Sequence, residues 1–523
     1  MLPKAALFTF SASILLLTGC ATTDMAAQPE GVATEIAASS LPFVREMDER
    51  FQSFQIGMSH LTGGETWRSY DEGAEEGEGG GENFEAIREA RAPTDLGNQR
   101  LRNLTAALAP LYIRYGGTTS NSVYFHNSDI PPPQEAPEGF QTVLTRESWR
   151  AALEFAQAVD AKVVTGFTVS DGVRDEDGLW TPVHAAPWLA YTEAVGGEIY
   201  AAELYNEPNA REPGRTEGPE SAESYARDFA RLSELTNRVA PDLKLAGPGT
   251  AMLGLPVPIP SLTQVSAEDY MTASPKPEFD IVSYHFYGAL AERCADPESL
   301  QGVSAADALT EEWLARPDAE FQKHKALRDR YAPDAPIWLT ETGTAACGGT
   351  RWQPTFLETF RYLDAMARLS KQGLDAIVTH ALISGSNGVI DEQTFMPNAD
   401  YWAALMWRRL MGTRILDAGP IAPGMHVYAH CQRGVPGGVT VLAINLEQQP
   451  RSMTLDGPVE IYALTAPELQ SRTVLLNDAP LELGPGDSVP ETEPVRQQAR
   501  EVMLAPTSST FIALPGADNP VCR

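Results

Sequence analysis

Residues 199–209 read IYAAELYNEPN, a short β-rich run that leads into a glutamate, Glu207, followed directly by Pro208. Proline has no backbone N–H to donate to a neighbouring strand, so the strand ladder stops there. The pattern predicts a strand with the carboxylate of Glu207 held in the turn just beyond its carboxyl end.

Seven further β-rich runs occur in the chain, with helical stretches between them. Together the eight runs cover residues 51–59, 111–117, 161–169, 199–206, 243–249, 279–287, 337–343 and 375–383. In the intervening stretches, for example 148–159 and 222–239, apolar residues recur every three to four positions, as on a helix with one buried face. Eight strands that alternate with helices predict an α/β fold, a closed (β/α)₈ TIM barrel over residues 45–414. A doubly wound sheet shares this pattern and is the alternative.

The alternation of strand-like and helical patterns stops near residue 415. Five short β-rich runs follow, separated by turns rich in Gly and Pro and without helical patterns between them: 425–431, 438–445, 451–455, 459–464 and 510–514. This pattern is typical of an all-β unit. We predict a C-terminal β-sandwich domain over residues 415–523.

An acidic, glycine-rich insert at residues 62–93 follows the first predicted barrel strand. In a barrel, it would lie on the face formed by the carboxyl ends of the strands, where such enzymes have their active sites. It is either a solvated loop or a lid that narrows the cleft.

Charge and composition exclude several classes of partner. The chain of 523 residues has 39 Lys and Arg against 70 Asp and Glu, a formal net charge of −31, and 43% of its residues are hydrophobic. It is therefore an ordinary globular protein without the basic surplus that phosphates attract, which argues against nucleic acid and anionic lipid. Cysteine and histidine spacings match no zinc motif, so we expect no metal and no cofactor.

The N-terminus has the features of a targeting segment. Lys4 precedes a mostly apolar stretch, and LTGC at residues 17–20 places small residues before Cys20. This resembles the lipobox of bacterial lipoproteins, which implies a signal peptide over 1–19, lipidation of Cys20 and a flexible tether over 20–44. The protein is then expected in a bacterial cell envelope, attached to the membrane (the outer membrane) only through this anchor. An ordinary signal peptide with a coincidental cysteine, and so a secreted protein, is the alternative.

A second carboxylate ends the seventh run, where residues 338–342 read WLTET and include Glu341. Three βα units separate it from Glu207, so the two side chains can face each other across part of the barrel. Hydrolysis of a glycosidic bond requires such a pair: one group protonates the leaving oxygen, and the other attacks the anomeric carbon or activates water. The two positions therefore predict a glycoside hydrolase.

Further motifs resemble glycoside hydrolase family 79, the heparanase and β-glucuronidase family. They occur in the family's order: LYIRYGGT (111–118), LYNEPN (204–209), IWLTET (337–342), DYW (400–402), MGT (411–413) and AINL (443–446). The resemblance spans residues 45–523. It implies a retaining enzyme with Glu207 as acid/base and Glu341 as nucleophile, and a substrate that is an oligosaccharide or polysaccharide. By position, Asn206 would donate to the sugar 2-hydroxyl and Thr118 would contact the sugar.

Three residues are expected to support these groups. His285 and Tyr287 end the sixth strand on one face. Tyr287 is placed to donate to Glu341, and His285 is either a substrate-binding or a packed histidine. Arg114 either holds Glu341 ionised, since its guanidinium matches a carboxylate, or anchors the core.

The chain departs from the family at the uronate site. The family's glucuronidases bind the uronate carboxylate with backbone N–H groups of a Gly-Gly pair and a tyrosine hydroxyl. Here Gly348 and Gly349 are displaced by about one position, with Cys347 in the first place, and Asn387 stands where the tyrosine would be. The expected function is a β-glucuronidase acting on extracellular glycans that contain glucuronic acid. The alternatives are the same machinery acting on a non-uronate β-glycoside and a non-catalytic glycan-binding lipoprotein.

The same resemblance assigns one pair among the remaining cysteines. Cys431 and Cys522 match a family disulfide that joins the C-terminus to the sandwich. Cys294 and Cys347 are left over and could form a second pair.

Overall fold

The computed structural model describes residues 34–70, 87–210, 219–252, 263–295, 302–498 and 500–523. Cys20, the predicted signal peptide and residues 71–86 of the acidic insert lie outside these ranges. No helix among the described residues has both the length and the apolar character needed to cross a bilayer.

The predicted (β/α)₈ barrel is confirmed. Eight parallel strands close on themselves, and the last pairs with the first through Ile377 opposite Gln52, which excludes the doubly wound sheet. The strands, in chain order, are β3 (Gln52–Gly57), β6 (Leu111–Gly116), β9 (Ala161–Gly166), β10 (Ile199–Glu203), β11 (Lys244–Thr250), β12 (Ile281–Leu290), β13 (Ile337–Ala346) and β14 (Ala376–Thr379).

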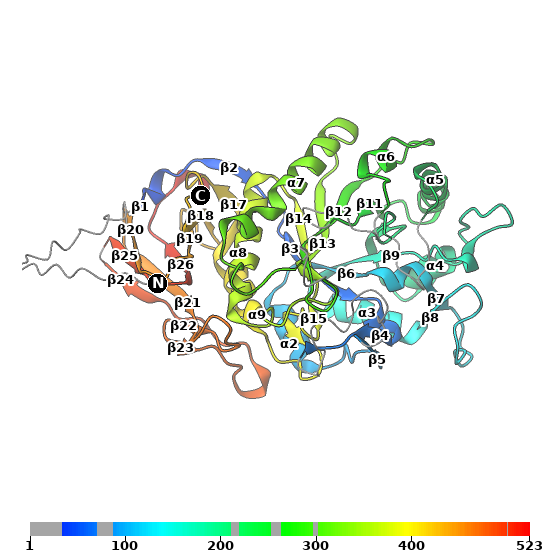
Figure 1. Ribbon diagram of the computed structural model, residues 1–523, viewed down its shortest axis with the longest axis horizontal. Coiled ribbons are helices and arrows are strands. Elements are labelled where there is room, and N and C mark those ends of the chain that lie inside the picture. Colours follow the sequence, from blue (N-terminus) through cyan, green and yellow to red (C-terminus); the bar gives the residue numbers. More distant parts are fainter. Residues whose placement is uncertain (1–33, 71–86, 211–218, 253–262, 296–301, 499) are drawn as a thin grey trace, which may run out of the picture.

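Helices cover the outside of the barrel (Figure 1). Several begin at a residue whose side-chain oxygen accepts a backbone N–H of the first turn, for example Thr145, Ser221 and Thr310. The main helices are α2 (Gln99–Ala107), α3 (Arg146–Ala158), α4 (Ala185–Ala194), α5 (Ala222–Val239), α6 (Ala267–Thr272), α7 (Glu311–Tyr331), α8 (Phe356–Gln372) and α9 (Ala399–Leu410). Helices α8 and α9 are buried along most of their length because they lie between the barrel and the C-terminal sheets.

The C-terminal sheets pack face to face, as expected for a sandwich. One sheet follows the order β2-β17-β18-β19-β26-β21-β22-β23 with β24 beside β21, and the other follows β1-β20-β25. Inward-facing residues such as Val441, Leu455 and Ile512 form their shared core. The strands are β1 (Thr34–Ile36), β2 (Phe43–Glu46), β17 (Met411–Leu416), β18 (Met425–Gln432), β19 (Val439–Asn445), β20 (Arg451–Leu455), β21 (Val459–Thr465), β22 (Leu475–Leu476), β23 (Ala479–Pro480), β24 (Val495–Gln497), β25 (Glu501–Leu504) and β26 (Ser508–Leu514).

Residues 34–44 are not part of a tether, contrary to the prediction. Strand β1 pairs with β20, and β2 pairs with β17. Between them, the Asp456 carboxylate accepts the backbone N–H of Ala38 at 3.0 Å, and Asn519 donates to the Ala38 carbonyl at 2.8 Å. Strands of three or four residues carry too little periodicity to be recognised without these distant partners.

The disulfide between Cys431 and Cys522 is present, with a Cα–Cα distance of 5.2 Å. It ties the C-terminal turn to β18, as the resemblance implied. Cys294 and Cys347, both of them described residues, are not joined by a disulfide. The suggested second pair is therefore wrong.

The base of the acidic insert forms an antiparallel hairpin at the carboxyl end of β3. It consists of β4 (Gly64–Trp67) and β5 (Arg88–Arg91), with Trp67 directly opposite Arg88. Both strands reach the cleft that contains the two predicted catalytic glutamates.

Candidate active site

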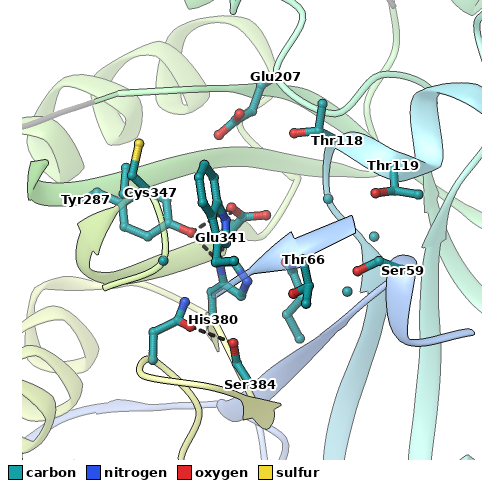
Figure 2. A pocket seen from close by; sticks show the side chains of 18 of the residues that line it. Ser59, Thr66, Thr118, Thr119, Glu207, Tyr287, Glu341, Cys347, His380 and Ser384 are labelled. Atoms are coloured by element: carbon teal, nitrogen blue, oxygen red, sulfur yellow. Dashed lines mark hydrogen bonds and ion pairs between the residues drawn. The ribbon is translucent and has the colours of Figure 1, made fainter. Parts of the chain in front are cut away.

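A cleft of about 270 Å³ lies at the carboxyl ends of the barrel strands (Figure 2). Of the residues predicted from the sequence, those that line it are Glu207, Glu341, Thr118, Tyr287, Gly348 and Asn387. This is the face on which barrel enzymes hold their catalytic groups.

The two glutamates point into this cleft from different strand ends. Glu207 follows β10 with a φ of 54°, in the left-handed region, and Glu341 lies within β13. One carboxylate oxygen of each and a ring nitrogen of His285 all lie within 4.8 Å of one another. Side chains far apart in sequence are thus brought to the spacing of a catalytic pair.

The same three groups could in principle ligate a metal ion. However, Arg114 donates to Glu341 Oε2 at 2.8 Å and the Tyr287 hydroxyl donates to Oε1 at 2.7 Å. Both carboxylate oxygens are thus held by donors, one of them a cation that would repel a metal. This donor set favours an ionised carboxylate held ready for chemistry.

The surroundings of Glu341 keep it ionised. Burial by itself raises the pKa of this carboxyl group. The imidazoles of His285 and His380 lower it most, followed by the Arg114 guanidinium and the Tyr287 hydrogen bond. Together they hold the pKa of Glu341 well below its usual range, so the group is a carboxylate at neutral pH.

Arg114 lies beneath the cleft and is 1% exposed. Its guanidinium donates to Glu203 Oε2 at 2.7 Å and to Glu341 Oε2 at 2.8 Å, so one cation lies between two buried carboxylates. Thr340 donates to the other oxygen of Glu203 at 2.9 Å. Arg114 therefore does both things considered from the sequence: it anchors the core through Glu203 and pairs with Glu341.

Asn206 is oriented by its neighbours. Its Oδ1 accepts a hydrogen bond from Arg114 at 2.9 Å. The side chain of Asn121 holds the backbone of Asn206 through two hydrogen bonds, of 2.9 Å and 3.0 Å. Because the oxygen end of the amide is already engaged, the NH₂ end is left as the donor that the predicted contact with a sugar hydroxyl requires. Asn206 itself is buried and is not among the residues that line the cleft.

His285 is fully buried and does not line the cleft. Its Nδ1 lies 3.0 Å from Glu207 Oε1, and its Nε2 lies 3.4 Å from Arg114. The structure therefore does not place His285 at the substrate, as one of the two expectations had it. Instead, the His285 ring contacts Glu207. The alternation of side chains along β12 placed this residue on the correct face but could not show its partner.

Only one glycine of the Gly-Gly pair reaches the cleft. Gly348 lines it, together with Cys347, and both have positive φ, 80° and 69°. Gly349 does not line it, and its N–H donates to the Ala345 carbonyl at 3.3 Å. The structure therefore does not place Gly349 at the cleft, where it was expected, because its N–H donor is used within the loop.

Asn387 lines the cleft near this loop. Its Oδ1 accepts a hydrogen bond from the Ser384 hydroxyl at 2.7 Å. As with Asn206, the NH₂ end of the amide is left as the donor for a ligand.

The sequence model described as glycosyl hydrolase family 79, N-terminal domain, matches residues 90–367, more than half of this chain. The chain belongs to glycosyl hydrolase family 79. It is a glycoside hydrolase, and its site is accordingly a site for sugars.

Relatives in this family cover most of the chain. Heparanase-like protein 1 of Arabidopsis thaliana is 27% identical over 493 residues, which is 82% of this chain and 86% of the relative. Baicalin-β-D-glucuronidase of Scutellaria baicalensis is 25% identical, covering 81% and 84%. Heparanase of Mus musculus is 24% identical, covering 82% and 88%.

Solved structures share the fold. A 4-O-α-L-rhamnosyl-β-D-glucuronidase from Fusarium oxysporum superposes with a TM-score of 0.58 at 15% identity, covering 91% of this chain and 99% of the other. A family 51 α-L-arabinofuranosidase from Thermotoga petrophila superposes with a TM-score of 0.61 at 12% identity, covering 92% and 99%. At this coverage, both alignments extend over the barrel and into the sandwich of this chain.

Sequence reasoning missed His380 in this family 79 site. Its Nδ1 lies 2.7 Å from the Tyr287 hydroxyl and 3.7 Å from Glu341 Oε1. It follows β14, so the strand-end rule that selected Glu207 and Glu341 could have found it as well. Glu203, the second partner of Arg114, had no such signal, because a buried carboxylate within a strand is recognised only from its cation.

Proposed function

We propose that this family 79 enzyme is a retaining β-glucuronidase that acts on extracellular glycans containing glucuronic acid, with Glu207 as acid/base and Glu341 as nucleophile. The supporting observation is the approach of the two carboxylates, whose nearest oxygens are within 4.8 Å. Retaining glycosidases have carboxyl groups about 5–5.5 Å apart, whereas inverting enzymes need about 6.5–9.5 Å to admit a water molecule.

The proposed reaction has two steps. In the first, Glu341 attacks the anomeric carbon while Glu207 gives its proton to the departing glycosidic oxygen, which leaves a glycosyl ester on Glu341. In the second, Glu207 takes a proton from a water molecule that attacks the same carbon and breaks the ester. The product keeps the β configuration, and both carboxyl groups return to their starting states.

Two donors at the cleft support a uronate substrate: the Asn387 amide and the Gly348 backbone. Among the described residues, the N–H of Gly348 makes no backbone hydrogen bond. Relatives and neighbours that are named as glucuronidases agree with this choice. The unavailability of Gly349 favours a second candidate, the same machinery acting on a neutral β-glycoside.

A panel of aryl β-glycosides separates these candidates. We expect hydrolysis of the β-D-glucuronide, with β-glucuronic acid as the first anomer seen by proton NMR. Appearance of the α-anomer first would contradict retention. Turnover of the glucoside, xyloside or galactoside alone would favour the neutral-substrate enzyme. No turnover of any of them would favour a glycan-binding lipoprotein.

We also propose that the mature protein is anchored in the cell envelope through a lipid on Cys20, a proposal supported by the LTGC pattern alone. Metabolic labelling with an alkyne fatty acid should mark the wild-type protein in a bacterial host. The variant Cys20→Ser should lose the label, because the thiol at the lipobox position is gone. Equal labelling of both proteins would show that the lipid, if any, is elsewhere.

A further inference from the structure

The hairpin β4–β5 brings an aromatic ring and a cation into the catalytic cleft. Trp67 and Arg88 line the same cavity as Glu207 and Glu341. They are direct neighbours across the two strands, and the Arg88 Cζ lies 4.6 Å from the centre of the Trp67 ring. Figure 2 shows Thr66, the residue before Trp67, at the edge of this cavity.

We propose that Trp67 and Arg88 recognise the sugar that occupies the catalytic cleft. Trp67 stacks on the sugar ring, and Arg88 pairs with the ring's carboxylate. This inference rests on the proposed β-glucuronidase function and assigns specificity to two residues outside the barrel strands.

Trp67 is held in place by the loop it covers. A side chain at Gly348 would lie 2.7 Å from Trp67 Cβ and Cγ, so the base of the Trp67 side chain packs directly against the glycine. The buried Arg293 joins the same two segments, donating to the carbonyls of Arg68 at 2.6 Å and Gly348 at 3.2 Å. Hairpin and loop therefore form one wall of the cleft, with the ring positioned before a ligand arrives.

The positive charge of Arg88 can attract an acidic sugar into a cleft that is otherwise lined by acids. Three acids, Glu65, Glu207 and Glu341, line the cleft, and Arg88 is the one arginine or lysine among its described lining residues. In a chain with a net charge of −31, an acidic sugar needs a local cation to enter such a site. A guanidinium matches a carboxylate with two parallel N–H donors. The Arg88 side chain is 14% exposed, lies 4.0 Å from Glu65 and packs over the Trp67 ring, so it is held at the cleft before a ligand arrives.

Arg68 provides a matched control on the same hairpin. It follows Trp67 directly, just beyond the end of β4, and its backbone N–H donates to the Ile87 carbonyl at 2.9 Å. Arg68 is not among the residues that line the cleft. The variant Arg68→Gln therefore removes the same charge next to the same hairpin without removing a residue that lines the cleft.

The experiment measures kcat/KM for aryl β-D-glucuronide and for its methyl ester, which has the same ring without the charge. Arg88→Gln should lower the value for the glucuronide by roughly ten- to a hundredfold, the usual effect of losing a hydrogen bond to a charged group. It should leave the value for the ester unchanged. Arg88→Lys should recover part of the loss, and Arg68→Gln should match wild type. Trp67→Ala should lower both values by roughly tenfold, because stacking does not depend on the carboxylate.

Equal values for Arg88→Gln and Arg68→Gln on the glucuronide would overturn the role of Arg88, and full activity of Trp67→Ala would overturn the role of Trp67. Thermal unfolding followed by circular dichroism checks that each variant is folded. A wild-type enzyme that hydrolyses neutral glycosides but no glucuronide refutes the proposed function itself. A glucuronidase that is insensitive to Arg88→Gln refutes only this inference.

Discussion

Replacement of Glu341 by alanine is expected to lower kcat on an aryl β-D-glucuronide by roughly 10⁴-fold or more, because the proposed nucleophile is lost. The substitution leaves space beside the anomeric carbon. Azide added to the solution can enter this space and attack from the side that Glu341 occupied. We therefore expect azide to restore turnover and to yield the α-glucuronosyl azide, which NMR distinguishes from the β-anomer.

Glu207→Ala provides the comparison. This variant keeps the nucleophile, so an aryl glucuronide with a good leaving group should still form the glycosyl ester. Azide then attacks the ester in place of water and yields the β-azide, because the configuration is inverted twice. If the two variants gave the same anomer, or if azide rescued only Glu207→Ala, Glu341 would not be the nucleophile.

The second large effect is expected at Arg114. The variant Arg114→Met leaves Glu203 and Glu341 buried without their shared cation; their side chains are 3% and 9% exposed. Breaking a buried ion pair by removing one partner costs about 3–5 kcal/mol. We expect a loss of this size in the free energy of unfolding, measured by urea denaturation at neutral pH.

The same variant should change the pH dependence of both stability and activity. In the wild-type protein the lowered pKa of Glu341 stabilises the fold above the ordinary carboxyl pKa, and this stabilisation is lost only as pH falls through the lowered value. Without Arg114 the pKa of Glu341 rises, and the nucleophile becomes protonated at a higher pH. The acid limb of kcat/KM should therefore move to higher pH, and the stability deficit should shrink as pH falls.

Arg114→Lys serves as the control, because it keeps the charge but loses the guanidinium fork. Its stability and acid limb should lie between those of wild type and Arg114→Met. A stable Arg114→Met with an unchanged pH profile would show that Arg114 neither anchors Glu203 nor tunes Glu341.

The barrel and its two glutamates could be predicted because their signals are local. A strand of five or more residues between amphipathic helices is visible in a short window of sequence, as at 199–206. In a closed parallel barrel every strand ends on the same face, so Glu207 and Glu341 follow from position alone. The positions of Thr118 and Asn387 at the cleft followed from the family motifs, and that of Tyr287 followed from its place on the sixth strand.

The contacts that define the chemistry are not local. Arg114 and Glu341 are 227 residues apart in the chain, and Ala38 and Asp456 are 418 apart. No short window holds both members of such a pair, so the partner of His285 and the strands within residues 34–44 were not predictable. The role of the acidic insert was likewise not predictable from a short window of sequence. Its base lines the cleft because Trp67 packs against Gly348, a residue far away in the chain.

The sequence by itself thus determined the barrel, the sandwich and the identity of the carboxylate pair, because periodicity and strand ends are properties of neighbouring residues. Arg114 and Tyr287 were expected beside Glu341, but only the tertiary structure decided that His285 contacts Glu207 and that His380 contacts Tyr287. Burial and electrostatic fields arise from residues that the fold brings together. The low pKa of Glu341 is an example: His285, His380 and Arg114 come from three different strand regions and act on one carboxylate.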